Sequence, residues 1–309
     1  MNILSIDFDY FQDVTESQLA EYPDDTIGIS ENTEMIAWAL RYTSLYDALG
    51  LKKIKISTKF LKKMEDLLLK MPKYIPVMIC NQHVEIVPFI RKYLVDHYSD
   101  GYIDFKRQDL HIYNVDLHHD MFGPDNEKLT KDTLHNGNWI KFMLAAKEPT
   151  TSMIKWFCRS VSIDAYKLND FARKAGTYLA VEGLKDLEDT EFGGIFLCKS
   201  STWLPPHLDK HFDELVHVIK DHFNNVKMSY ADPLILNRYS VIKKTAKEMD
   251  EKLNVIKKQP YNEPLGPLPP LYMDLDGDII KYDNGDINIT YMNKDGKWTI
   301  KDDDDLPFV

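Results

Sequence analysis

The chain has 309 residues, of which 44% are hydrophobic and 28% are charged. This is an ordinary globular composition, and it excludes a chain that is disordered as a whole. Its net charge of -11 argues against a nucleic-acid partner, because non-specific binding to phosphate backbones needs clustered lysine and arginine. No apolar run approaches the roughly 18 residues of a membrane span, and the acidic start of the chain does not resemble a signal peptide. With three widely spaced cysteines, we expect a cytoplasmic protein with reduced thiols and no membrane partner.

Strand-like and helix-like patterns alternate through the first part of the chain. Short apolar runs predict strands, and apolar residues recurring every three or four positions predict helices. In chain order the patterns predict a strand at 1–8, helices at 34–49 and 58–71, a strand at 74–80, a helix reaching 98 and a strand at 110–117. This alternation is typical of parallel strands joined by crossover helices, so we expect an α/β fold.

The chain changes character towards its C-terminus. Further predicted elements are strands at 160–165 and 194–198, a helix at 213–223 and a long helix from Asp232 towards Lys257. Five prolines at 260–270 then indicate a stiff linker, and short strands separated by Asp-Gly and Asn-Gly pairs predict a small β-meander. We therefore divide the chain into an α/β domain at 1–258, a linker at 259–270 and a β appendage with an acidic tail at 271–309.

Potential metal ligands follow three of the predicted strands, near the residue where each strand ends. They are Asp7 and Asp9 after the first strand, His83 after the second, and Asp116, His118 and Asp120 after the third. Open α/β sheets bind ligands outside the carboxyl ends of their strands, where several loops converge. Carboxylate and imidazole ligands together suit Mn²⁺ and similar ions. Taken singly, each run is also compatible with a polar loop that has no site.

The first and third runs resemble metal-binding motifs of one superfamily. The S-x-D-x-D run at 5–9 and the D-x-H-x-D run at 116–120 resemble two of the three motifs of the arginase and agmatinase (ureohydrolase) superfamily, in the swapped order of a circular permutation. With the Gly-Asn-Trp run at 137–139 and the run at 201–206, residues 1–210 resemble the permuted branch that includes the peptide arginases of ribosomal-peptide pathways. The resemblance implies a three-layer, arginase-like α/β fold and a pair of Mn²⁺ ions, with Fe²⁺ or another divalent ion as the alternative.

The resemblance also implies a role for each ligand. Asp116 and Asp7 would bridge the two ions, His83 and Asp120 would complete the first site, and His118 and Asp9 would complete the second. The superfamily has G-G-D-H where this chain has a Cys-Asn-Gln-His run at 80–83, so His83 is also compatible with a structural histidine.

Arginase chemistry needs a proton donor and a grip on the substrate. His135 follows the D-x-H-x-D run at a sequence separation similar to that in arginases and is the predicted proton donor. His119 is the alternative donor. Glu31 and Glu34 are candidates to hold a guanidinium, because a carboxylate matches its fork, although both also suit a helix start or a solvated helix face. Asn138 is the remaining predicted substrate-binding residue.

The resemblance implies hydrolysis of a guanidine C–N bond, converting peptidyl arginine to ornithine with release of urea. The expected partner is an arginine-containing peptide or another cationic guanidine, which the acidic surface would attract. Other function classes stay open: a two-metal or haloacid-dehalogenase-like phosphoesterase, since Asp7 and Asp9 also fit that family's Asp-x-Asp, or a non-catalytic peptide-binding module. The sequence predicts no oligomeric state.

Overall fold

The computed structural model describes two compact units, Met1–Lys252 and Leu253–Val309. The described residues are 1–20, 31–98, 109–122, 130, 133–145, 150–166, 178–229 and 238–258, with four short strands at 272–273, 279–282, 289–292 and 298–300.

The first unit is built on a seven-stranded sheet in which every strand runs parallel to its neighbours. Its strands, in spatial order, are β5 (Tyr178–Glu182), β4 (Thr150–Cys158), β3 (Asp109–Val115), β1 (Asn2–Asp7), β6 (Gly194–Cys198), β2 (Pro76–Cys80) and β7 (Asn225–Met228). β2 and β6 are buried along their whole length and β1 is buried from Ile3 onwards, as expected for strands covered on both faces. Because all strands point the same way, their carboxyl ends share one edge of the sheet.

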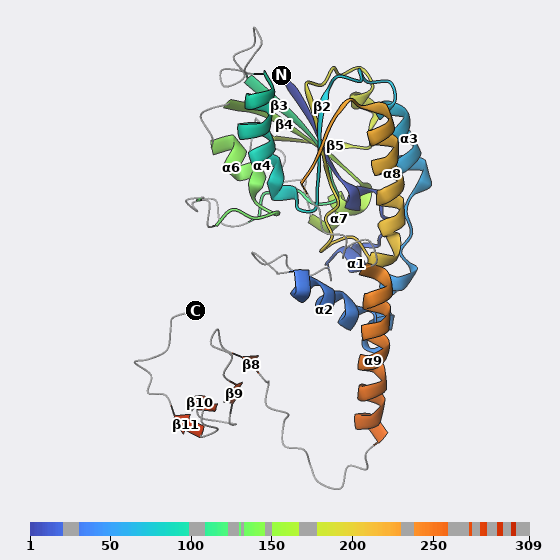
Figure 1. Cartoon of the computed structure of the whole chain (residues 1–309), viewed down its shortest axis with the longest axis vertical. Helices are drawn as coiled ribbons and strands as arrows, with labels where there is room; N and C mark the ends of the chain where they lie inside the picture. Colours follow the sequence, from blue (N-terminus) through green and yellow to red (C-terminus); the bar gives the residue numbers. More distant parts are fainter. Residues whose placement is uncertain are drawn as a thin grey trace. The chain divides into compact units, whose positions relative to one another are not determined.

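Helices cover both faces of this sheet. The α-helices among the described residues are α1 (Glu16–Ala20), α2 (Glu31–Arg41), α3 (Thr58–Leu68), α4 (Ile86–Pro88), α5 (Val95–Tyr98), α6 (Trp139–Ala145), α7 (Ser160–Tyr166), α8 (Asp209–His222) and α9 (Arg238–Lys258). Short 3-10 turns lie at Phe8–Phe11, Ser44–Leu49, Leu51–Lys53, His83–Glu85, Lys185–Leu187 and Pro206–Leu208, and a π-helical turn lies at Phe89–Leu94. Figure 1 shows α4 and α6 on one side of the sheet and α3 and α8 on the other.

Two hydrophobic cores fill the spaces between the three layers. Successive strand residues contribute to opposite cores: Leu4 packs with α3 and α8, whereas Ile3 packs with α4 and α6. This alternation follows from the two-residue period of a strand. The predicted three-layer α/β fold is therefore confirmed.

The prediction of a strand at 160–165 is wrong. Residues 160–166 form α7, and the strand lies just before it, as β4 at Thr150–Cys158. Alternating serine, valine and isoleucine suggested a two-residue period, but Val161 and Ala165 are also four residues apart and pack together against the first core as one helical face. The predicted helix at 34–49 is likewise two elements, α2 and a 3-10 turn at Ser44–Leu49.

The second unit contains the predicted β-meander. Its strands β8 (Tyr272–Met273), β9 (Ile279–Tyr282), β10 (Ile289–Met292) and β11 (Trp298–Ile300) pair antiparallel with their neighbours in chain order. The predicted linker at 259–270 and the predicted start of the long helix at Asp232 lie outside the described residues. Each helix among the described residues is too short or too polar to cross a membrane.

Candidate metal centre

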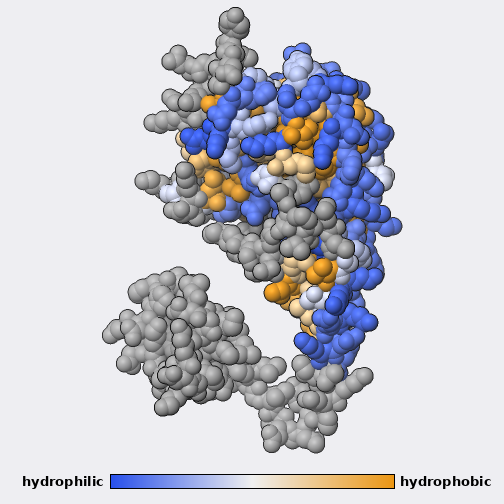
Figure 2. All heavy atoms as spheres, in the orientation of Figure 1, coloured by the Kyte–Doolittle hydropathy of each residue, from blue (hydrophilic) through white to orange (hydrophobic). Residues whose placement is uncertain are grey.

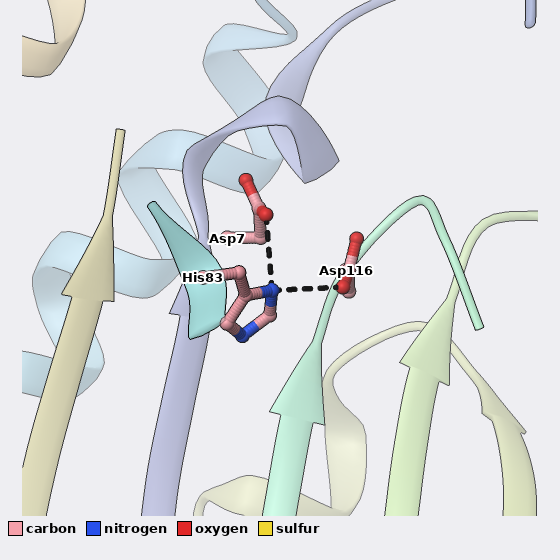
Figure 3. A group of neighbouring side chains, drawn as sticks. All are labelled: Asp7, His83 and Asp116. Atoms are coloured by element: carbon pink, nitrogen blue, oxygen red, sulfur yellow. Dashed lines mark ion pairs between the residues drawn. The ribbon is translucent and has the colours of Figure 1, made fainter. Parts of the chain in front are cut away.

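Three carboxylates surround one ring nitrogen of His83. Its Nδ1 lies 3.1 Å from Oδ2 of Asp7, 3.3 Å from Oδ2 of Asp116 and 3.0 Å from Oδ2 of Asp120. Figure 3 shows His83 entering from the turn after β2, between Asp7 at the end of β1 and Asp116 after β3. The carboxyl ends of three strands thus bring together residues that are far apart in the sequence.

The other ring nitrogen of His83, Nε2, contacts Ser5 on the side of the ring away from the carboxylates. Nε2 lies 2.8 Å from the hydroxyl oxygen of Ser5, and the imidazole ring lies parallel to Phe196, with centroids 5.9 Å apart. In the tautomer that would bind an ion, the ring carries its proton on Nε2 and donates it to Ser5, which turns the lone pair of Nδ1 to the side of the carboxylates. Partners behind a ligand set the tautomer and ring direction in this way at metal sites.

A second group lies next to the first. Nδ1 of His118 is 2.8 Å from Oδ2 of Asp9 and 3.6 Å from Oδ1 of Asp116. Asp116 therefore turns one carboxylate oxygen towards His83 and the other towards His118. Ligand atoms of Asp7, His83 and Asp116 lie within 4.8 Å of one another, and so do those of Asp9, Asp116 and His118. Each of these two groups could hold a metal ion.

Local turns hold these carboxylates in position. Asp7 accepts a hydrogen bond from the backbone N–H of Asp9 at 3.1 Å, and Asp116 accepts one from the N–H of His118 at 2.7 Å. Both are Asx turns, which form readily when aspartate follows a strand. Asp120 lies in the left-handed region with φ of 49°, a conformation that aspartate tolerates better than most residues. This backbone geometry brings the Asp120 carboxylate to His83.

Burial and mutual repulsion disturb the titration of the four carboxylates. Burial, followed by a neighbouring aspartate charge, raises the pKa of Asp7 and Asp9, and raises that of Asp120 to about 7. The pKa of Asp116 is lowered instead: burial opposes its charge, but the neighbouring imidazoles of His118 and His83 outweigh burial. The two imidazoles thus do not provide enough positive charge to stabilise all four ionised carboxylates. A bound cation would stabilise them.

The donor atoms fit a metal ion. Three buried atoms of the cluster make no hydrogen bond of acceptable geometry among the described residues, although the first two have the close N···O contacts given above: Oδ2 of Asp9, Nδ1 of His83 and Nε2 of His118. Such atoms are rare in folded proteins because each costs about 1–3 kcal/mol of desolvation. Carboxylate oxygens with imidazole nitrogens suit borderline divalent ions such as Mn²⁺ and Fe²⁺ better than a thiolate-binding ion. The cluster is therefore shown to be suited to a metal, while the identity of the ion stays a prediction.

A small pocket opens onto the cluster. Besides metal-ligand candidates, its lining consists of Phe122, His135, Asn136, Gly137, Ser200 and Trp203, and its cavity volume is about 60 Å³. Phe122 N donates to Gly137 O at 2.8 Å, and a Cβ at Gly137 would lie 2.8 Å from the Phe122 ring. Glycine at 137 therefore allows the two loops to meet. His135 and the six predicted ligands share this corner of the molecule.

Of the other predicted site residues whose side chains the structure describes, none lines this pocket. The ring of His119 packs against Phe122 and Tyr166, with centroids 4.2 Å and 4.8 Å away, and burial lowers the pKa of His119 to about 4. Asn138 is buried and ties its own loop, since Oδ1 accepts from His135 N at 2.9 Å and Nδ2 donates to Thr133 O at 2.8 Å. In this structure both ends of the Asn138 amide therefore serve the loop.

Of the two glutamates predicted to bind substrate, Glu34 has its carboxylate engaged within the protein. Glu34 is buried, and its Oε1 accepts from Nη1 of Arg238 at 2.5 Å while its Oε2 accepts from the hydroxyl of Ser201 at 2.7 Å. Its carboxylate thus already holds a guanidinium, that of the chain's own arginine. Glu31 begins α2, and its side chain lies outside the described residues.

Several supporting residues escaped sequence reasoning. Asn114 Nδ2 lies 3.3 Å from Oδ2 of Asp116, as Ser5 lies behind His83. The sequence contains a signal for both, because Ser5 and Asn114 each stand two residues before a candidate ligand aspartate at the end of a strand, and so share its face. The indole of Trp156, which donates to the backbone O of Asp116 at 3.0 Å, left no such signal.

Comparison of the chain with protein-family models, curated proteins and solved structures found no match.

Proposed function

We propose that this protein is a hydrolase with two divalent ions, Mn²⁺ or Fe²⁺, that cleaves the guanidine C–N bond of arginine in a peptide. The products would be urea and an ornithine side chain. The observation that best supports this proposal is the sharing of Asp116 between two adjacent buried groups of potential ligands, at the mouth of which His135 stands. Sequence resemblance supplies the reaction class, and the geometry supplies a matching site.

When two divalent ions occupy a close pair of sites, they lower the pKa of water towards neutrality and polarise the substrate. Asp116, Asp7, Asp9 and Asp120 would balance the charge of the ions, and His83 and His118 would complete the two sites. Ser5 keeps the coordinating face of His83 directed at the cluster through its contact with Nε2. Burial of the ligands excludes competing water from all but the pocket side.

His135 is placed to give a proton to the leaving group. As water oxygen bonds to the guanidinium carbon, the bond from that carbon to the side-chain nitrogen breaks, and this nitrogen takes up a proton to become the ornithine amine. Nδ1 of His135 accepts a hydrogen bond from Gly137 N at 3.1 Å, so Nε2 is the ring nitrogen left for proton exchange with the pocket. The attacking water loses a proton as its oxygen bonds to carbon, and an imidazole that lines the same pocket is suited to pass that proton to the leaving nitrogen.

The shape of the pocket favours a small cationic head group on a larger molecule. A cavity of about 60 Å³ accommodates little more than the guanidinium end of a side chain. Phe122, which is 38% exposed, and Trp203 offer aromatic faces, which attract cations. An exposed aromatic ring at the mouth is compatible with a peptide lying across it.

The direct test compares substrates on Mn²⁺-loaded protein. We expect urea release from an arginine-containing peptide at least tenfold faster than from free arginine, which corresponds to about 1.4 kcal/mol of transition-state binding. A peptide with lysine in place of arginine is the matched control, and peptide mass follows conversion to ornithine. Turnover of p-nitrophenyl phosphate without urea from any arginine compound would overturn the proposal in favour of a phosphoesterase. No urea from metal-loaded protein with either substrate would also overturn it.

A further inference from the structure

The loop at 133–139 contacts two segments that bear candidate metal ligands. Oδ1 of Asn136 accepts a hydrogen bond from the backbone N–H of Val84 at 3.0 Å, and Val84 directly follows His83. Val84 lies in the first turn of the 3-10 helix at His83–Glu85, and the first N–H groups of a helical turn have no acceptor within it. The side chain of Asn136, 52 residues away in sequence, therefore caps the turn that presents His83.

The same loop ends on Trp139, which contacts two of the candidate ligands. Its indole N–H donates to Oδ2 of Asp120 at 2.5 Å, and its ring centroid lies 4.9 Å from that of His83. His83 and Asp120 also contact each other, with 3.0 Å between Nδ1 and Oδ2. These contacts form a closed circuit. Its members, in order, are His83, Val84, Asn136, Trp139 and Asp120.

Hydrogen bonds within the loop make it a single unit. Asn138 accepts from His135 N at 2.9 Å and donates to Thr133 O at 2.8 Å. Gly137 N donates to Nδ1 of His135 at 3.1 Å, and Gly137 O accepts from Phe122 N at 2.8 Å. A shift of the loop at either end of the circuit therefore moves the His135 ring, which lines the pocket at the metal centre.

The loop itself is only partly covered by the rest of the protein. Residues 133–137 are half-buried, whereas Asn138 and Trp139 are buried. Figure 2 shows apolar residues exposed, among hydrophilic ones, on the side of the molecule where α6 lies, and α6 begins at Trp139. A partly exposed segment opens at a lower free energy than a core strand or helix. The polar contacts of the loop therefore contribute much of what keeps it in position.

We propose that Asn136 is a positioning residue of the metal centre, and that binding of a divalent ion is coupled to the position of the loop at 133–139. An ion bound by His83 and Asp120 would fix the two ends of the circuit and thereby hold the loop. Coupling between two sites is reciprocal, so a loop that lacks the Asn136 contact binds the ion more weakly.

This role of Asn136 differs from that of Ser5. Ser5 contacts the ring of His83 and sets its direction, whereas Asn136 contacts the backbone beside His83 and sets the position of the turn. The consequence for the reaction is that the imidazole of His135 is held in the pocket when the ligands hold their ion. The inference rests on metal binding, which is part of the proposed function, and is independent of the reaction and the substrate.

Hydrogen exchange on the unaltered full chain, followed by mass spectrometry, tests the coupling. We expect saturating Mn²⁺ to slow exchange severalfold in peptides that contain the N–H groups of Val84, Phe122, His135 and Gly137, although these residues belong to neither ligand group. Peptides from α8, on the other side of the sheet, are the internal control. Slowing no greater than in α8, in protein that binds the ion, would overturn the proposal.

Substitution tests the part played by Asn136. Asn136→Ala removes the acceptor for Val84 and should weaken Mn²⁺ binding, measured by calorimetry, by about tenfold or more, as loss of a partner that supports a metal ligand does. Asn225→Ala is the matched control, because it removes another side-chain hydrogen bond to backbone, from Nδ2 to Tyr74 O at 3.2 Å. Circular dichroism checks folding. Equal affinity in the two variants would overturn the role of Asn136.

A conservative variant separates position from charge. Asn136→Asp keeps an oxygen that can accept from Val84, so it should restore both the affinity for Mn²⁺ and the slowing of exchange in the loop. The added negative charge by itself would raise affinity without restoring the slowing of exchange. Restored affinity with no Mn²⁺-dependent slowing would therefore overturn the positioning role.

The outcomes distinguish this inference from the proposed function. Wild-type affinity in Asn136→Ala, together with urea release from an arginine-containing peptide, would remove the coupling and leave the hydrolase. Weaker affinity in Asn136→Ala and slower loop exchange with Mn²⁺ in the wild type, with no urea from any substrate, would leave the coupling and remove the hydrolase. A wild-type protein that binds no divalent ion would remove both.

Discussion

Trp139 donates its indole N–H to Oδ2 of Asp120 at 2.5 Å, and both side chains are buried. The same carboxylate oxygen lies 3.0 Å from Nδ1 of His83. Asp120 has a φ of 49°, so its position depends on contacts that hold it there rather than on an ordinary backbone conformation. Trp139 thus orients a candidate metal ligand from a helix that follows it in the chain.

Trp139→Phe should therefore weaken metal binding. The ring stays in the core, but Asp120 loses the donor that directs it, and loss of such a partner typically costs 10- to 100-fold in metal affinity. Titration with Mn²⁺ while following thermal stability would measure the change. Ile140→Val, one position along the same buried helix, is a control for packing alone. Equal metal affinity in Trp139→Phe and Ile140→Val would refute the orienting role.

The shared carboxylate should distinguish two sites from one. Asp116 belongs to both ligand groups, whereas Asp9 belongs to one. Asp116→Asn should leave almost no bound metal and no activity, while Asp9→Asn should retain close to one ion per chain. Metal counting by mass spectrometry on the purified variants would decide this. Equal metal content in the two variants would mean that Asp116 is not a bridge.

His135 should matter for turnover but not for metal binding. Its ring lines the pocket without belonging to either ligand group. His135→Ala should keep the metal content of the wild type and slow turnover by roughly 10²-fold or more, because the leaving amine loses its proton donor. His119→Ala is the informative companion, since that ring packs among aromatics. Slower turnover in His119→Ala, with normal turnover in His135→Ala, would identify His119 rather than His135 as the proton donor.

Metal affinity should rise with pH between 6 and 8. Burial and the charge of Asp116 raise the pKa of Asp120 to about 7, so this carboxyl is largely protonated at pH 6 in the metal-free protein. An ion binds the carboxylate and displaces the proton, so binding releases protons below the raised pKa and gains affinity as pH rises through it. Calorimetry in buffers of different ionisation enthalpy would count those protons. Affinity independent of pH over this range would contradict the prediction.

Glu34→Gln should lower stability and leave metal binding intact. The side chain of Arg238 is 2% exposed and that of Glu34 is 11% exposed, so removal of the negative charge weakens a buried charge-assisted hydrogen bond. We expect a loss of about 2 kcal/mol in the free energy of unfolding, measured by urea denaturation. Glu248→Gln, at an exposed position in α9, should change it little. Lost arginine turnover at unchanged stability would instead restore Glu34 as a substrate-binding residue.

Sequence alone predicted the edge of the sheet at which the candidate metal ligands lie. The carboxyl ends of parallel strands lie at one edge of the sheet whatever the details of packing. Aspartates at the ends of β1 and β3 and a histidine after β2 are therefore expected at that edge. The apolar strands and the amphipathic helix at 58–71 were equally legible, because burial on one or two faces imposes a period on the residues themselves.

Tertiary structure alone decided which way side chains in the loops turn. Beyond a strand end no periodicity constrains side-chain direction, so His119 packs in an aromatic cluster while its neighbours His118 and Asp120 lie in the cluster of candidate metal ligands. Glu34 accepts a hydrogen bond from Arg238, which is 204 residues away in sequence, and no local sequence pattern predicts that contact. Local sequence determined the sheet and its acidic edge because those follow from short-range periodicity. Partner choice among buried polar groups depends on contacts that only the folded chain creates.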